Sequence, residues 1–290
     1  MFDFDAIAND MNQKFSFSAD AYMPDGQWYI LNDVDTKLGY YLEDSNTIHP
    51  YGTLDSETQE EIMNAFNKFV GGPVYAMYKA NKLIYTLISN PTFDVTYASD
   101  LYKNLIIGSA IVLYGISDGI KYAKKFLTWL DTTDFYQAPA SAKYHDAYDG
   151  GLLRHSLTVV YHITELLHVS SFHEVNIASA ILVALVHDLC KINLYEPYMK
   201  NVKDDVSQTW VQVQAYKYRD AMIPLGHGVS SLYIVQKFFK LDLEQALAIR
   251  WHMGRWNLCD GESAEYHAAV KSYPLVYMLQ FADQLSITSY

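Results

Sequence analysis

The sequence is poor in cysteine, with only Cys190 and Cys259 among its 290 residues. Two cysteines separated in this way provide neither a disulfide framework nor a cysteine pair of the kind that binds zinc. Their scarcity excludes a disulfide-stabilised scaffold and points to the reducing cytoplasm.

Long hydrophobic runs are also absent. The longest apolar stretch, LIIGSAIVLYGI at residues 105–116, is about half the ~20 residues that a membrane-spanning helix needs. The first residues, MFDFDAIANDMNQ, are acidic and lack the basic and apolar regions of a secretory signal. We therefore expect a buried helix at residues 105–116 and a cytoplasmic protein with no membrane partner.

Positive charge is scarce as well, since 21 Lys and Arg face 33 Asp and Glu, for a net charge of −12. Proteins that follow long nucleic acids neutralise many phosphates with basic side chains. Extended nucleic acid is therefore a poor partner for this chain. A small anionic substrate with one or two local basic contacts remains compatible, and the sequence gives no oligomeric state.

The first 120 residues indicate a smaller α+β region of unknown role. Short pieces rich in Tyr and β-branched residues alternate there with turn signals. We expect a β-hairpin at residues 73–88 with its turn near Lys79 and Lys82. A helix is expected to start near Ser56, a candidate cap, and His49 is expected in a solvated turn.

From residue 121 to residue 290 the pattern becomes helical, which predicts an all-α domain and a mainly α protein. Helices are expected at residues 121–130, 151–169, 177–189, 230–239, 243–252 and 274–287. A polar loop at residues 201–218 contains a candidate short hairpin.

The most informative motif is His187-Asp188, which closes the apolar run ASAILVALVHDLCK. Burying an imidazole and a carboxylate costs several kcal/mol unless the groups are paired or bind a metal. Neighbouring nitrogen and oxygen ligands can be aimed at one divalent cation. The pair therefore predicts a metal site if further ligands exist elsewhere.

Further candidate ligands occur in similar apolar or glycine-rich settings. They are His155 in GGLLRHSL, His227 in PLGHGVSS, His252 in AIRWHMG and Asp283 in YMLQFADQL. A single histidine on an apolar helix is more often a satisfied core residue, and a single aspartate is more often a surface residue. The joint order H…HD…H…H…D favours a metal centre instead.

In their order and local contexts these motifs resemble the HD superfamily of metal-dependent phosphohydrolases, over residues 135–286. The stretch YHDAYDGGLLRHSL is similar to the corresponding part of YhaM-type 3′-5′ exoribonucleases, and to HD proteins of phages and Firmicutes. The resemblance implies a C-terminal HD-domain helical bundle.

The resemblance also implies ligand roles. His155, His187, Asp188 and Asp283 would surround one metal, and His227 and His252 would add a second, with Asp188 bridging. Nitrogen and carboxylate ligands suit Mn, Fe, Zn, Ni or Co, and Mg is compatible. A bridging water of lowered pKa would be the nucleophile.

Other residues have less certain roles in this scheme. Lys191 is placed to contact a phosphate or orient the nucleophile, although a cation at a helix end is an equal interpretation. His145, in a second His-Asp pair, is expected near the substrate as a supporting residue or acid catalyst. Arg154, Arg250 and Arg255 flank ligands and are candidate phosphate-binding residues, or else solvated arginines. Gly150-Gly151 is expected to give a tight turn before the His155 helix, and Cys190 is expected to be packing.

The leading hypothesis is a phosphohydrolase or phosphodiesterase acting on a nucleotide or short oligonucleotide. One alternative is a 3′-5′ exonuclease on single-stranded RNA or DNA. Another is a mixed-valence diiron oxygenase of the HD fold, and the third is a nucleotide-binding module without catalysis. Metal analysis together with hydrolysis assays separates them.

Overall fold

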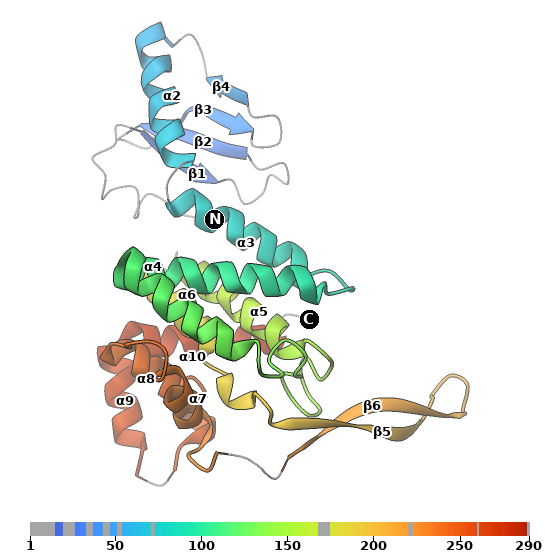
Figure 1. The fold of residues 1–290 in the computed structure, drawn as a ribbon. Helices are drawn as coiled ribbons and strands as arrows, with labels where there is room; N and C mark the ends of the chain where they lie inside the picture. Colours follow the sequence, from blue (N-terminus) through green and yellow to red (C-terminus); the bar gives the residue numbers. More distant parts are fainter. Residues whose placement is uncertain are drawn as a thin grey trace. The chain divides into compact units, whose positions relative to one another are not determined.

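The computed structural model describes most of the chain. The described residues are 15–19, 27–32, 37–42, 47–50, 54–70, 73–167, 175–219, 223–259 and 261–288. The protein is mainly helical, as expected (Figure 1). It divides into two compact units, one of Met1–Leu83 with His168–His173 and the other of Ile84–Leu167 with Glu174–Tyr290.

The described part of the first unit holds a four-stranded antiparallel sheet, one complete helix and most of the next helix, which runs on into the second unit. Its elements are β1 (Phe15–Ala19), β2 (Gln27–Asn32), β3 (Lys37–Leu42), β4 (Thr47–Pro50) and α2 (Ser56–Val70), with the strands in sequence order. Helix α2 begins at Ser56 as expected, but Asp55 is its cap, because the Asp55 carboxylate accepts from the Thr58 amide at 2.8 Å. His49 lies exposed in β4 rather than in a turn.

The hairpin expected at residues 73–88 is wrong, because these residues form helix α3 (Pro73–Ile88). Asn81, Ile84 and Ile88 are buried along it, and steps of three and four residues place side chains on one face of a helix. The tyrosines and β-branched residues suggested strands, but the helical spacing of the apolar positions decides the structure.

Helix α4 (Val95–Leu130) begins at the Asp94 cap and breaks at Gly115, whose φ of 78° and ψ of 165° are not helical. Its two arms pack closely, since a Cβ on Gly119 would lie 2.5 Å from the Ala110 carbonyl oxygen. The boundary expected after residue 120 therefore falls inside one helical element, and the compact units separate at residues 83 and 84 instead.

The apolar stretch at residues 105–116 is helical, but only one side of it is buried. Ile106 and Ala110 are inaccessible, whereas Val112 and Ile116 are 64% and 72% exposed. By length and composition alone, α4 is the single helix in the described residues that could cross a membrane. The break at Gly115 means that α4 is not one straight rod.

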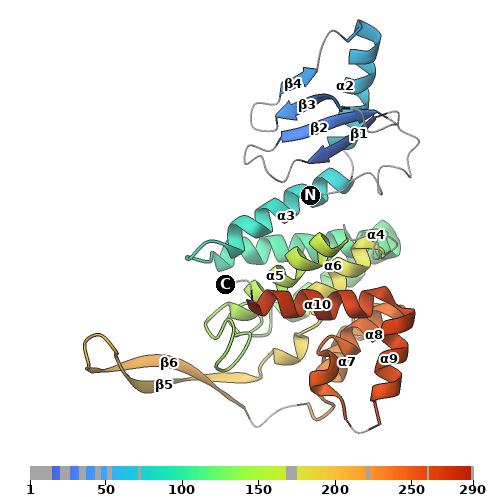
Figure 2. The same cartoon turned by 180° about the vertical axis from the view of Figure 1, so that it is seen from behind.

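The second unit is organised around the buried helix α6 (Ile177–Val186). Helix α5 (Gly151–Leu166) packs against both α6 and α10 (Pro274–Thr288), and α4 also contacts α6 (Figure 2). The remaining helical elements are η2 (Leu189–Lys191), α7 (His227–Val235), α8 (Leu243–Trp251), η3 (Gly254–Asn257) and α9 (Ser263–Ser272). This bundle brings α5, α6, α7, α8 and α10 together.

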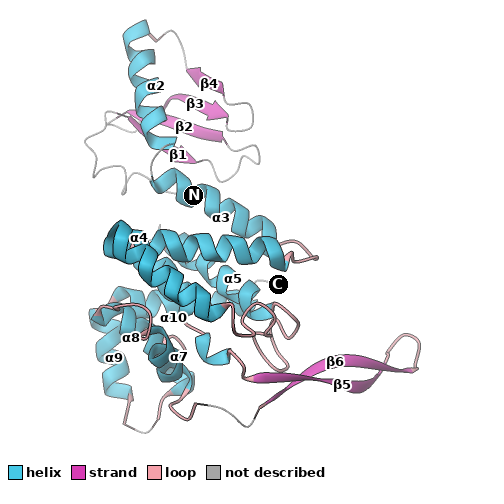
Figure 3. Ribbon diagram, viewed as in Figure 1, coloured by secondary structure: helices cyan, strands magenta, loops and turns pink. Residues whose placement is uncertain are grey.

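A long hairpin leaves the bundle between η2 and α7 (Figure 3). Its strands β5 (Tyr195–Lys203) and β6 (Trp210–Tyr218) pair antiparallel from Tyr195 with Tyr218 out to Lys203 with Trp210. The short hairpin expected at TWVQVQAYKY, residues 209–218, is wrong, because residues 210–218 form the single strand β6 and its partner β5 lies at residues 195–203. Most side chains of both strands are exposed.

Candidate metal centre

The six expected ligands come from five helices and converge on one buried place. His155 lies within α5 and Asp283 within α10, while His227 is the first residue of α7. His187 and His252 cap the C-termini of α6 and α8, and Asp188 follows His187. Three groups of these residues hold donor atoms within 4.8 Å of one another: His155, His187 and Asp188; His187, His252 and Asp283; and Asp188, His227 and His252.

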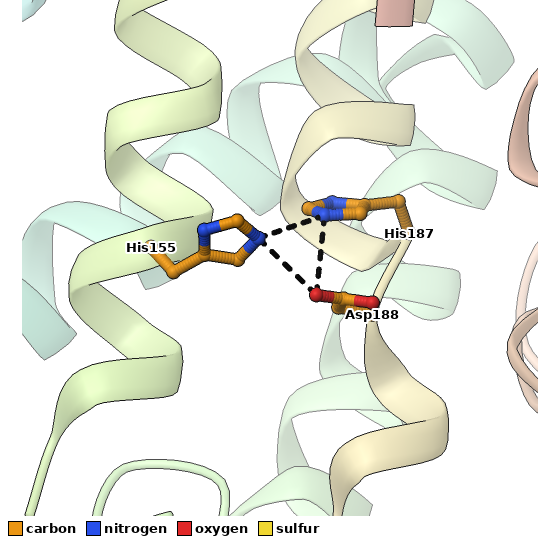
Figure 4. Close-up of side chains that lie close together, drawn as sticks. All are labelled: His155, His187 and Asp188. Atoms are coloured by element: carbon orange, nitrogen blue, oxygen red, sulfur yellow. Dashed lines mark hydrogen bonds and ion pairs between the residues drawn. The ribbon is translucent and has the colours of Figure 1, made fainter. Parts of the chain in front are cut away.

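The Asp188 carboxylate lies at the centre, with one oxygen toward each pair of histidines. Its Oδ2 is 3.2 Å from His155 Nε2 and 3.4 Å from His187 Nε2, as Figure 4 shows. Its Oδ1 is 2.6 Å from His227 Nε2 and 3.5 Å from His252 Nε2. A carboxylate arranged in this way can serve two neighbouring positive charges at once.

Asp283 completes the His155 and His187 side. Its Oδ1 lies 3.2 Å from His155 Nε2 and 3.8 Å from His187 Nε2. The two imidazole Nε2 atoms are themselves only 3.2 Å apart. At this distance the lone pairs of two unprotonated ring nitrogens would repel each other. A proton or a cation must therefore lie among these groups.

In His187 and His252, a hydrogen bond from Nδ1 turns Nε2 toward the centre of the site. His187 Nδ1 donates to the Ala184 carbonyl at 2.8 Å, and His252 Nδ1 donates to the Ile249 carbonyl at 2.7 Å. Both acceptors are last-turn carbonyls that lack a helical partner. Each histidine therefore ends its helix and fixes its own ring with Nε2 facing the centre, as metal-binding histidines require.

His155 is oriented by a side chain distant in the sequence. The Ser286 hydroxyl donates to the Asp283 carbonyl at 2.6 Å, so its oxygen is left to accept from His155 Nδ1 at 3.2 Å. His227 differs, because the sulfur of Cys190 lies 3.4 Å from its Nδ1. Cys190 therefore contacts a ligand in addition to packing.

A glycine lets α7 and α8 approach closely enough to juxtapose His227 and His252. A Cβ on Gly228 would lie 2.1 Å from the Arg250 carbonyl oxygen, well inside a normal contact. The expected turn before His155 is present too, since Gly150 has a φ of 83° and a Cβ on Gly151 would meet the Asp146 carbonyl at 2.0 Å.

Asp188 and Asp283 change the pKa values of the histidines around them. Burial opposes protonation of His155, but hydrogen bonds to Asp188 and Asp283 outweigh it and raise its pKa to about 9. Burial also opposes protonation of His227, and Asp188 raises its pKa to about 9. The Asp188 pKa is held well below its ordinary value, because Lys191, His187 and His227 outweigh burial.

Lys191 forms a buried ion pair with the central carboxylate. Its Nζ lies 2.6 Å from Asp188 Oδ2, and the two side chains are 10% and 4% exposed. Burial disfavours the ammonium, but Asp188 raises the Lys191 pKa above its ordinary value. Lys191 therefore stays charged and points at the same oxygen as His155 and His187.

A cavity of about 610 Å³ opens onto these groups and is lined by Asp188, Lys191, His227, His252 and Asp283. Aromatic residues that the sequence analysis did not single out also line it: Tyr144, Tyr195, Tyr218 and Trp256. Tyr144 and Trp256 are each 86% exposed. Tyr144 directly precedes His145 and Trp256 directly follows Arg255, so their place beside candidate site residues was the only signal in the sequence.

His145 lies in the same cavity, as expected. Its ring centroid is 5.1 Å from that of His155, and its Nε2 is buried with no hydrogen-bond partner in the described structure. Burial, together with the charges of His155 and Lys191, lowers its pKa to about 4. His145 is therefore neutral at pH 7, which suits a hydrogen-bonding or proton-accepting role better than that of a resting acid.

The three arginines proposed to bind phosphate are not among the cavity-lining residues in the described structure. Arg154 bonds Asp146 at 3.0 Å and also Tyr148 and the Ile88 carbonyl. Arg250 pairs with Glu262, and Arg255 lies 2.8 Å from His267 Nε2. These arginines are near candidate ligands in the sequence, but neighbouring residues of a helix point in different directions. Their side chains therefore reach other partners and not the cavity.

The donor set fits divalent cations. His252 Nε2 is buried and makes no hydrogen bond to any described residue, although its ring is aimed at the centre. Imidazole nitrogens and carboxylate oxygens are the ligands that zinc, iron, manganese and similar metals take. His155, His187, Asp188 and Asp283 could hold one cation, and His227, His252 and Asp188 a second.

Comparison with known proteins agrees with this geometry. Residues 152–287 match the family model of the HD domain, a range that contains all six candidate ligands. Such domains generally belong to metal-dependent hydrolases. No curated protein and no solved structure matches the chain significantly. The match covers somewhat less than half of the chain, and over that part the protein is similar to HD domains.

Proposed function

We propose that the protein is a metal-dependent phosphodiesterase or phosphohydrolase that acts on a nucleotide or short oligonucleotide through two metal ions. The observation that carries the proposal is the division of the Asp188 carboxylate, with Oδ2 toward His155 and His187 and Oδ1 toward His227 and His252. A bridging carboxylate between two sets of nitrogen ligands is what a dinuclear site requires.

Two such cations would polarise a phosphoryl oxygen and lower the pKa of a water molecule. The chain's own groups supply the surroundings. Lys191 holds a positive charge beside Asp188 Oδ2, where it would attract a phosphate oxygen. The neutral His145 ring would accept a proton or hydrogen bond from a group in the cavity.

The aromatic residues at the cavity support a base-bearing substrate. Tyr144, Tyr218 and Trp256 line the cavity with 40% or more of each residue exposed. Stacking of a base on an aromatic ring contributes about 1–3 kcal/mol per base, and large exposed rings beside a polar site favour a flat ligand. Both cysteines are free, in keeping with the proposed cytoplasmic location.

The test combines metal analysis with hydrolysis of bis(p-nitrophenyl) phosphate and of nucleotides. We expect two transition-metal ions per chain, loss of activity on chelation, and at least a 1000-fold loss of kcat in Asp188→Asn. A protein that holds no metal, or whose Asp188→Asn variant hydrolyses at the wild-type rate, refutes the proposal. Oxygen consumption by the iron-loaded protein, without phosphate release, would instead identify an oxygenase.

A further inference from the structure

The β5–β6 hairpin starts at the cavity and has two chemically different faces. Residues directly opposite each other in an antiparallel pair lie on the same face, and the face alternates along each strand. Tyr195 and Tyr218 form the first pair and line the cavity. On their face, farther out, lie Met199, Asn201 and Lys203 of β5 and Gln212 and Trp210 of β6, which we call the outer strip.

The outer strip has the composition of a surface that binds bases. Trp210 and Met199 are 71% and 57% exposed, and the two amides and Lys203 are exposed as well. The strip offers a stacking ring, amide donors and acceptors, and one cation, and it contains no carboxylate. The opposite face carries three valines, the Glu196–Lys217 ion pair, Lys200 and Tyr198, whose ring is smaller and less exposed than that of Trp210, at 38% against 71%.

The base of the hairpin is hydrogen-bonded to the bundle, and these bonds fix the direction in which the outer strip leads away from the cavity. Tyr216 and Gln214 both donate to Asp149 Oδ1, at 2.5 Å and 3.1 Å. Arg219 Nε donates to the Tyr195 carbonyl at 2.8 Å. The two bonds to Asp149 hold this end of the hairpin against the loop before α5, and the Arg219 bond joins the ends of its two strands.

We propose that the outer strip binds the bases of a single-stranded oligonucleotide whose terminal phosphodiester lies in the cavity, an inference that rests on the proposed function. At about 3.3 Å per residue, the eight steps from Tyr218 to Trp210 span roughly 26 Å. A mononucleotide held at the metal centre does not reach Trp210, so only a longer ligand can contact the whole outer strip.

The acidic balance of the chain agrees with binding through bases. Lys200 and Lys203 are close in sequence to Asp204 and Asp205, so the hairpin offers little net positive charge for phosphates. Affinity that depends on stacking is tolerant of sequence. It loses less to added salt than affinity that depends on many phosphate contacts.

The test measures binding of fluorescein-labelled oligothymidylates of two to twelve nucleotides to the metal-loaded full chain by anisotropy, with phosphorothioate linkages to slow turnover. We expect the affinity to rise with length and then level off. Trp210→Ala should weaken binding of the long strands roughly 5- to 150-fold, as loss of one stack predicts. Trp210→Phe should keep most of the wild-type affinity. The matched control is Val211→Ala, one residue along the same strand on the other face, which should stay within twofold of wild type.

Length-independent binding, no binding, or equal losses in Trp210→Ala and Val211→Ala overturn the proposal. A change from dimer to monomer in Trp210→Ala, seen by light scattering, would also overturn it by making the strip an interface between two copies. Hydrolysis of bis(p-nitrophenyl) phosphate, measured separately, tests the proposed function alone. If the protein hydrolyses that ester but its affinity for strands does not depend on their length, the proposed function stands and the role of the outer strip is refuted.

Discussion

Replacing Asp188 with asparagine should destabilise the metal-free protein through the charge that it leaves behind. Asparagine has nearly the same volume, so no cavity forms. The change removes the negative partner of Lys191 Nζ, which lies 2.6 Å from Asp188 Oδ2 in a pair of side chains that are 10% and 4% exposed. Breaking a buried ion pair from one side costs about 3–5 kcal/mol, because the remaining charge stays desolvated.

Measured by thermal unfolding in EDTA at pH 7.5, that cost corresponds to a fall in Tm of about 6–20 °C, at roughly 2–4 °C per kcal/mol. Glu196→Gln is the matched control, because Glu196 Oε1 and Lys217 Nζ are 2.7 Å apart, but their side chains are 44% and 60% exposed. Solvent screens such a pair, so its loss should leave Tm nearly unchanged.

The double variant Asp188→Asn/Lys191→Met separates charge from shape. Removing the unpaired ammonium should restore part of the lost stability, because His155 and His227 still lack the Asp188 carboxylate. Metal binding and hydrolysis should stay absent. If Lys191→Met brings no recovery in the Asp188→Asn background, or if Asp188→Asn and Glu196→Gln lower Tm equally, the reasoning from a desolvated ion pair is refuted.

His252→Ala should reduce the bound metal from two ions to one per chain, as counted by plasma emission; a count that stays at two would show that His252 is no ligand. In urea unfolding, Gly228→Ala should lower the free energy of unfolding by roughly 1–3 kcal/mol, because the new Cβ would lie 2.1 Å from a backbone oxygen. The control Gly108→Ala should be neutral or stabilising, since a Cβ there meets nothing within 4 Å. In EDTA, stability should fall as the pH rises from about 6.5 toward 9, because His155 and His227 have pKa values raised to about 9 and lose their favourable protonated state across that range. For the same reason, metal binding at pH 7.5 should release protons, detectable by calorimetry in buffers of different ionisation enthalpy; a constant heat in all buffers would contradict it.

The helical half could be predicted from the sequence because its apolar residues recur at helical spacing. The same spacing was present at residues 73–88, where Ile84 and Ile88 are buried, but tyrosine and β-branched residues suggested strands. The break of α4 at Gly115 had no such signal, because a single glycine in an apolar run is equally compatible with a continuous helix.

The candidate ligands could be identified because buried histidine and aspartate are costly, and their order along the chain is specific. The sequence could not show that Asp188 offers its two oxygens to different histidine pairs. That division depends on how α5, α7 and α8 meet. The three arginines lie outside the cavity lining for a related reason, since nearness in sequence does not determine the direction of a long side chain.

The way in which the histidines are aimed makes the site unevenly tolerant of mutation. His187 and His252 bond to main-chain carbonyls of their own helices, and no side-chain substitution removes a carbonyl. His155 depends on the hydroxyl of Ser286, 131 residues away, which one base change can delete. Substitutions around the two helix-end histidines therefore leave their ring orientation unchanged, whereas the orientation of His155 depends on one side chain of another helix.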